Sequence, residues 1–145
     1  MDMKVGIVLL ATAGAWAAAL HAAPAQQDAR SVWGGVYTQE QAKRGAVLYA
    51  EHCSPCHGGS LAGVESAPAL TGVEFGSNWN GLTLGDLFER IRMSMPADDP
   101  GKLSGPQKVD IVAHILSVGK FPAGTAELPR DAQVLAQIRY ESTKP

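Results

Sequence analysis

The chain has 145 residues, which is enough for one compact domain but hardly for two. Charged residues make up 18% and hydrophobic residues 46% of the sequence, and the formal net charge is -2. This composition is ordinary for a soluble globular protein and lacks the basic surplus that binding to a phosphate backbone requires. Nucleic acid is therefore not expected as a partner, and we look for one core and one site.

The N-terminal segment has the three parts of a secretory signal. Lys4 precedes a nearly uninterrupted apolar run over 5–20, and the small residues Ala23 and Ala25 follow it. Cleavage after Ala25 would remove 1–25 as a signal peptide. An uncleaved membrane anchor is the alternative, but the run falls short of the ~20 residues that cross a bilayer. We therefore expect a periplasmic protein that has no membrane span once the signal is removed.

The first helix of the folded domain is predicted to begin after Thr38. Residues 26–37 contain two glycines and have no helical period, so an extended lead-in is predicted there. The spacing of Thr38 and Gln41 is that of a capping box, which predicts a helix to about Glu51. Small residues and one aromatic residue share a face of this helix, so another helix can approach closely: Ala42, Gly45, Ala46 and Tyr49.

Two more helices are predicted after a long glycine-rich segment. Residues 58–81 show no sustained period, so we predict mostly ordered loop, long enough to wrap around something. Thr83 and Ser104 look like helix caps, and apolar residues at helical spacing follow each of them. The first of these helices must stop before Pro96, and Gly119 can close the second.

The C-terminal extension over 123–145 is predicted to contain a short helix capped by Asp131. No segment has the alternation of a strand, and the sequence shows no internal repeat. The predicted fold class is therefore all-α, with three to five short helices and long loops. So few short helices need an additional component in their core.

The chemistry-bearing motif is C-x-x-C-H, formed by Cys53, Cys56 and His57, which is the attachment signature of c-type haem. Two intervening residues let both sulfurs meet the two vinyl groups on one edge of the porphyrin, while the adjacent imidazole turns onto the iron. Thioether bonds would consume both thiols. This answers why a cysteine pair in an exported chain need not become a disulfide. One covalent haem c, with its iron, is the expected cofactor.

Three other uses of the cysteine pair are less consistent with the sequence. A thioredoxin-like redox pair expects a βαβ setting, which the helical pattern does not provide. Zinc would need two further ligands, and only the scattered His52 and His114 are at hand, both of which we interpret as surface residues. A plain structural disulfide explains neither His57 nor the long loop.

A second axial ligand to the iron is expected from methionine, whose thioether raises the reduction potential of a haem. Met93 and Met95 are the candidates. On the predicted helix Met93 lies about 180° from Leu84, so it points away from the apolar face. Pro96 disfavours helical geometry at Met95, which places this residue in an extended segment that can turn its sulfur towards the iron. We choose Met95.

Residues 38–122 resemble the class I mono-haem cytochrome c family, and in particular periplasmic cytochromes c associated with quinoprotein dehydrogenases. The resemblance rests on the C-x-x-C-H motif, on Gly45 and Tyr49 where the family crosses its first and last helices, and on 95–101, which is similar to the family's methionine-ligand loop. It implies a compact class I cytochrome c domain over 38–122, wrapped around one covalently bound haem.

The resemblance also implies roles for residues around the haem. The carbonyl of Pro68 would accept the Nδ1 hydrogen of His57 and fix its tautomer, and Leu70 would press on the haem. Trp79 is a candidate to hydrogen-bond a haem propionate. A tryptophan of the core is the equally open alternative.

The expected function is the transfer of one electron at a time, with His57 and Met95 bound to the iron throughout, so the protein is not expected to be an enzyme. Transient redox partners are implied, with a periplasmic dehydrogenase as donor and an oxidase or another cytochrome as acceptor. A haem subunit of a dehydrogenase complex is one alternative. A haem enzyme that binds a small molecule at an open iron position is the other.

Overall fold

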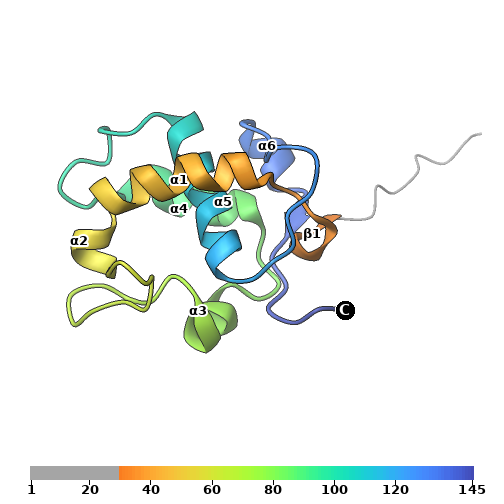
Figure 1. Cartoon of the computed structure of the whole chain (residues 1–145), viewed down its shortest axis with the longest axis horizontal. Helices are drawn as coiled ribbons and strands as arrows, with labels where there is room; N and C mark the ends of the chain where they lie inside the picture. Colours follow the sequence, from red (N-terminus) through yellow and green to blue (C-terminus); the bar gives the residue numbers. More distant parts are fainter. Residues whose placement is uncertain (1–29) are drawn as a thin grey trace, which may run out of the picture.

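The computed structural model describes residues 30–145, and the predicted signal peptide over 1–25 lies outside them (Figure 1). The described chain contains one 3-10 helix, six α-helices and one pair of short strands: β1 (Arg30–Ser31), η1 (Val32–Gly34), α1 (Gln39–His52), α2 (Ser54–His57), α3 (Gly72–Trp79), α4 (Leu84–Ser94), α5 (Gly105–Val118), α6 (Ala132–Leu135) and β2 (Ile138–Arg139). The predicted all-α fold class is confirmed. Within 30–145 no helix is both long and apolar enough to cross a membrane.

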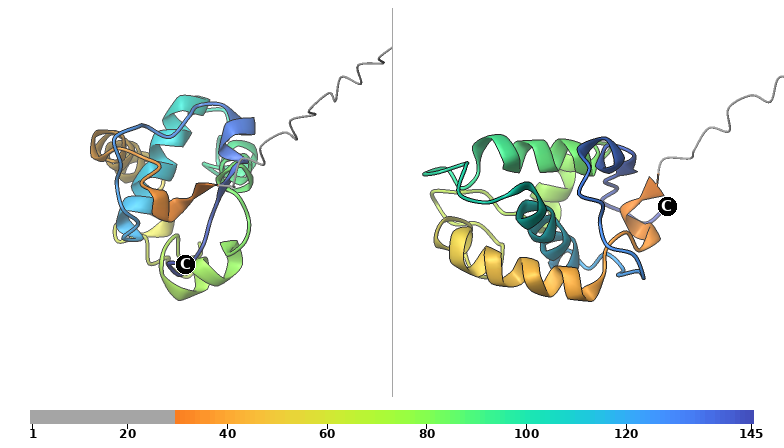
Figure 2. Two further views of the ribbon diagram at one scale, coloured as in Figure 1. Left: turned by 90° about the vertical axis from the view of Figure 1, so that its right-hand side faces the viewer. Right: turned by 90° about the horizontal axis from the view of Figure 1, so that it is seen from above.

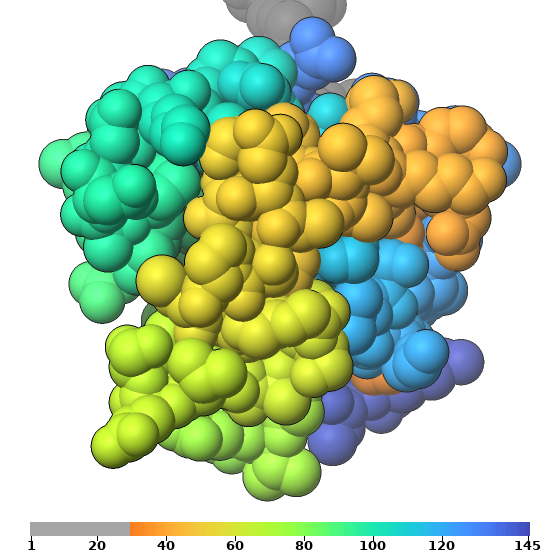
Figure 3. Space-filling model, turned by 60° about the vertical axis from the view of Figure 1, so that its left-hand side comes forward, coloured from red at the N-terminus to blue at the C-terminus, as the bar shows by residue number. Residues whose placement is uncertain are grey.

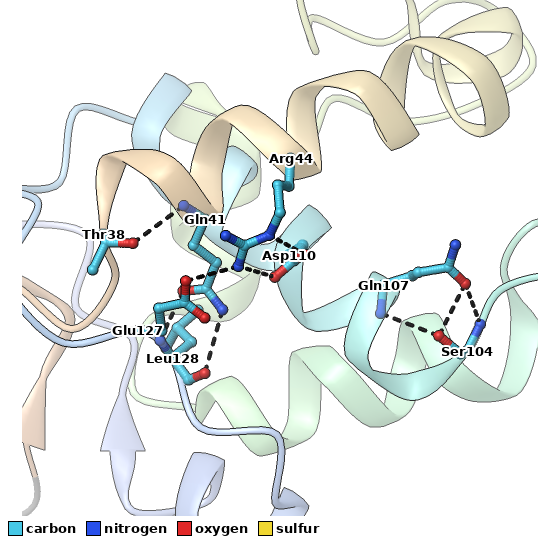
Figure 4. A network of polar contacts seen from close by, with 8 residues as sticks. All are labelled: Thr38, Gln41, Arg44, Ser104, Gln107, Asp110, Glu127 and Leu128. Carbon is cyan, nitrogen blue, oxygen red and sulfur yellow. Dashed lines mark hydrogen bonds and ion pairs between the residues drawn. The ribbon is translucent and has the colours of Figure 1, made fainter.

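The predicted caps are found at the starts of four helices. Thr83 and Ser104 form complete capping boxes with Asp86 and Gln107, and Figure 4 shows the box at Ser104. The Asp131 side chain accepts from the first turn of α6. These caps satisfy N–H groups that the helix itself leaves without partners.

At the start of α1 the capping box is only half formed. The Thr38 hydroxyl accepts from the Gln41 N–H at 3.1 Å, as predicted. The Gln41 side chain does not reach back to Thr38. It is fully buried and pairs instead with the backbone of Leu128, donating to its carbonyl at 3.3 Å and accepting from its N–H at 2.7 Å (Figure 4). The capping box is incomplete because the N–H and carbonyl of Leu128 bind the Gln41 side chain inside the core.

The centre of the fold is the packing of α5 between α1 and α4 (Figure 2). Where α1 crosses α5, a Cβ added at Gly45 would stand 1.8 Å from the Asp110 carbonyl oxygen, so only glycine allows this approach. Ala42 and Tyr49 are buried on the same face of α1, and Ile111 and Leu116 are buried on α5. The crossing implied by the resemblance is therefore present.

Residues on both sides of 38–122 contribute to the same core. Val32 and Tyr37 before the first helix and Leu128, Leu135 and Ile138 near the C-terminus are almost completely buried. β1 pairs with β2 in parallel, so the two ends of the described chain lie side by side at the end of the molecule opposite α2 (Figure 1). The C-terminal extension therefore contributes buried side chains to the core of the domain.

Helix α3 was not predicted, since its sequence lies within the segment expected to be mostly loop. Two glycines in eight residues lower its intrinsic helix propensity, and its N-cap residue Thr71 makes no side-chain cap bond. Phe75 is buried against Trp79 and Tyr140, with ring centroids 5.8 Å away in each case. Packing against distant parts of the chain therefore stabilises this helix.

Candidate functional site

The two cysteines and the histidine of the motif lie on one tight turn. Cys53 ends α1 and caps α2, and its carbonyl accepts from the N–H of Cys56 at 3.2 Å and of His57 at 2.9 Å. Both thiols are free, and Cys53 is half-buried while Cys56 is exposed. Burial, together with the neighbouring Cys56, raises the pKa of the Cys53 thiol to about 11. The turn thus presents both sulfurs beside one imidazole.

The imidazole of His57 is buried and held by a backbone carbonyl. Its Nδ1 lies 2.8 Å from the carbonyl oxygen of Pro68, the contact that the resemblance implies. A carbonyl oxygen can only accept, so Nδ1 carries the hydrogen and Nε2 keeps its lone pair for a metal. Such a bond also fixes the ring orientation and raises the basicity of the ligand nitrogen.

Pro68 is held in place by the internal bonds of the loop that follows α2. The N–H of Gly63 donates to the His57 carbonyl at 3.0 Å, and the N–H of Leu70 donates to the Leu61 carbonyl at 2.8 Å. From α1, the Tyr49 hydroxyl donates to the Gly58 carbonyl at 2.7 Å. The loop is therefore tied to both α1 and α2.

An open hollow of about 470 Å³ lies against this loop, lined by residues 62–69 and Glu74. Neither Cys53, His57 nor Met95 lines it. Since the ligand candidates lie elsewhere, we do not take this hollow for the cofactor site.

Met95 follows the last turn of α4 and has extended backbone geometry, with φ −130° and ψ 142°. The prediction that it lies in an extended segment just beyond the helix is confirmed. Met95 is half-buried, whereas 65% of the Met93 surface is exposed. The chain after α4 and the loop after α2 occupy the same end of the molecule (Figures 1 and 2), and a hollow separates them in Figure 3. The fold thus brings Met95 to the same end as the Cys–His turn.

The other residues proposed to contact a haem are partly buried. Leu70 and Trp79 both pack against the hydrophobic core, Trp79 through Phe75. Their roles towards a haem stay predictions.

The interpretation of His52 and His114 as surface residues is only partly right, because both are of intermediate burial. Only 10% of the His52 side chain is exposed, and the His114 ring lies against Tyr49 with the centroids 5.2 Å apart. For His114 the reason is the close approach of α1 at Gly45, which covers that side of α5.

One buried polar residue near Met95 was not predicted. Lys108 has 1% of its surface exposed and donates to two backbone carbonyls that flank the Met95 segment. A signal was available in the sequence, because Lys108 stands at position i of an i, i+3, i+4, i+7 pattern whose other members are the buried residues Ile111, Val112 and Ile115.

These residues fit a covalently attached haem. They supply two free thiols one helical turn apart, an adjacent imidazole whose Nδ1 is already bonded, and a thioether at the same end of the molecule. The thioredoxin alternative requires a βαβ unit, and none occurs in the part of the chain that the structure describes.

An all-α fold that carries a C-x-x-C-H turn is the arrangement of a c-type cytochrome, and the family match assigns it to class I. The chain belongs to the family described as cytochrome c oxidase, cbb3-type, subunit III, whose sequence model matches residues 40–115. It is accordingly a cytochrome c domain, which carries a covalently attached haem c and takes part in haem-based electron transfer. No curated protein and no solved structure matches the chain significantly.

Proposed function

We propose that this protein is a periplasmic electron carrier, moving one electron at a time between a dehydrogenase and a downstream acceptor on a haem c ligated by His57 and Met95. The observation that carries the proposal is the buried His57 ring, whose Nδ1 is bonded to the Pro68 carbonyl at 2.8 Å. This bond leaves Nε2 as the ligand nitrogen.

The bound haem supplies reversible one-electron chemistry between ferrous and ferric iron. The residues around the haem would set its reduction potential. Cys53 and Cys56 hold the porphyrin permanently, and the Pro68 carbonyl fixes the tautomer of His57. A thioether from Met95 favours the ferrous form and so raises the reduction potential.

A carrier would follow from this ligand set because His57 and Met95 would both hold the iron, leaving it free to exchange electrons but not to bind a substrate. Export, indicated by the N-terminal signal over 1–25, would bring the protein to periplasmic dehydrogenases as donors and to an oxidase or another cytochrome as acceptor. Contacts with such partners are typically small and brief.

The test is an optical spectrum of protein produced in a periplasm with haem-attachment machinery, in oxidised and dithionite-reduced forms. We expect a sharp reduced α-band and a weak far-red band in the oxidised form. Met95→Ala should abolish the far-red band, while Met93→Ala should keep it, because Met93 is 65% exposed. A high-spin spectrum that shifts with carbon monoxide would contradict the carrier function and favour a haem enzyme.

A permanent haem subunit of an oxidoreductase is the second candidate, and it is favoured by the family description, which names an oxidase subunit. Leu128, Leu135 and Ile138 are buried within the protein's own core, so contacts of the C-terminal extension with a larger subunit would use its exposed residues, such as Gln133 and Gln137. Purification from the native membrane and periplasmic fractions discriminates the two. A large partner that co-purifies in constant ratio supports the subunit, and a monomeric cytochrome supports the carrier.

A further inference from the structure

A buried ammonium group lies where α4 ends and the loop after it begins. Nζ of Lys108 donates to the carbonyl oxygen of Arg92 at 3.2 Å and to that of Pro100 at 2.6 Å. Within residues 30–145, no carboxylate lies within ion-pair distance of this nitrogen. Burying an ammonium group is costly unless it is hydrogen-bonded, so these two carbonyls are essential to its position.

The Arg92 carbonyl needs a donor from outside its own helix. In a continuing helix the N–H of residue 96 would donate to it, but Pro96 has no N–H. The preceding carbonyl, that of Ile91, still receives the Met95 N–H at 2.9 Å. Arg92 is thus the first carbonyl at this helix end that the following backbone cannot satisfy, and Lys108 supplies the hydrogen bond.

The second carbonyl lies at the far end of the same segment. Between the two carbonyls the loop makes one turn, in which the Asp99 N–H donates to the Pro96 carbonyl at 3.2 Å. A second turn spans Pro100, with the Lys102 N–H donating to the Asp99 carbonyl at 3.1 Å. One ammonium group therefore joins the last turn of α4 to Pro100, and Met95 lies between these two points.

We propose that Lys108 is a positioning residue for Met95, holding both ends of segment 92–100 so that the methionine sulfur stays on the iron. The inference rests on the proposed function, because it takes Met95 as the axial ligand. Thioether sulfur is a soft ligand, so it is more easily displaced from ferric than from ferrous iron. How often Met95 leaves then sets how strongly an external ligand binds.

The test is imidazole binding to the ferric holoprotein, followed by loss of the far-red band. Lys108→Met keeps the length and the apolar stem of the side chain but removes the ammonium group. Because both carbonyls lose a charge-assisted hydrogen bond, we expect imidazole affinity to rise roughly tenfold or more, while the reduced α-band of the attached haem persists. The reduction potential should fall.

Gln41 provides a matched control for general loss of stability. It is equally buried and also makes two hydrogen bonds to backbone, but it ties α1 to Leu128 rather than to the Met95 segment. We expect Gln41→Leu to lower the thermal midpoint and yet to leave imidazole affinity within about twofold of the wild-type value. Should Lys108→Met not fold, Lys108→Gln keeps one donor group and should raise the affinity roughly threefold.

The outcomes separate this inference from the proposed function. A wild-type ferric protein without a far-red band contradicts Met95 ligation and overturns both. If the band is present, the inference alone is overturned when the Lys108 variants bind imidazole as wild type does, or when Gln41→Leu raises the affinity as much as they do.

Discussion

At the scale of single residues, His114 is the clearest case of an environment changed by packing. Its ring lies against Tyr49, and burial lowers its pKa below the ordinary value of 6.5. The folded protein therefore keeps His114 neutral at pH values where the unfolded chain has begun to protonate it. Between the lowered pKa and 6.5, the unfolded state binds more protons than the folded state does.

The sign of this difference fixes how stability depends on pH. The free energy of unfolding should rise with pH through the window just below 6.5 and decrease as the solution becomes more acidic. His114→Gln should remove this part of the dependence. Denaturant unfolding of both proteins at about pH 5 and at about pH 7.5 measures it. If wild type and His114→Gln showed the same pH dependence, His114 would have the same pKa in the folded and the unfolded state, contrary to the prediction.

At the scale of elements, the crossing of α1 over α5 depends on one glycine. A Cβ at position 45 would stand 1.8 Å from the Asp110 carbonyl oxygen and 2.5 Å from its carbon, both of them backbone atoms. The helices would have to separate, since backbone cannot rotate away as a side chain can. We expect Gly45→Ala to lower the free energy of unfolding by about 1–3 kcal/mol or more.

Gly59→Ala is the matched control, because a Cβ there meets nothing within 4 Å. Chemical denaturation of the holoprotein compares the two variants with wild type. Equal stability of the Gly45 and Gly59 variants would mean that the close helix approach is not required.

Elements were predictable where the determining side chains are neighbours in sequence. The caps at Thr83, Ser104 and Asp131 use residues two or three positions away, so local spacing is sufficient to find them. α3 was missed because Phe75 owes its burial to Tyr140, which is distant in sequence. Gln41 matched the local capping-box motif, but its side chain bonds to the backbone of Leu128, which is also distant in sequence.

At the scale of the whole molecule, the candidate haem ligands could be predicted from neighbouring residues, whereas the residue that positions Met95 could not. The cysteines and His57 form a contiguous motif, and Pro96 indicated the extended geometry at Met95, so sequence alone predicted them. Lys108 acts on carbonyls 8 and 16 residues away, and only the tertiary structure brings them together. The contribution of the C-terminal segment to the core is likewise a long-range property.

That segment is open to a direct test at α6. Leu135 is fully buried, and α6 packs closely enough on α4 that a Cβ at Gly85 would lie 2.8 Å from the Ala136 Cα. Leu135→Ala should therefore leave a cavity in the core and cost about 2–5 kcal/mol in the free energy of unfolding. Gln133→Ala, at an exposed position of the same helix, should change it by less than about 0.5 kcal/mol.

Unfolding followed both by the α-helical circular dichroism signal and by the haem absorbance makes this test specific. Because the C-terminal segment and α1 share one core through Leu128 and Gln41, both signals should shift to the same lower midpoint in Leu135→Ala. A shift of the helical signal alone would show that residues around α6 unfold separately from the haem site, and an unchanged midpoint would mean that α6 adds nothing to the stability of the core.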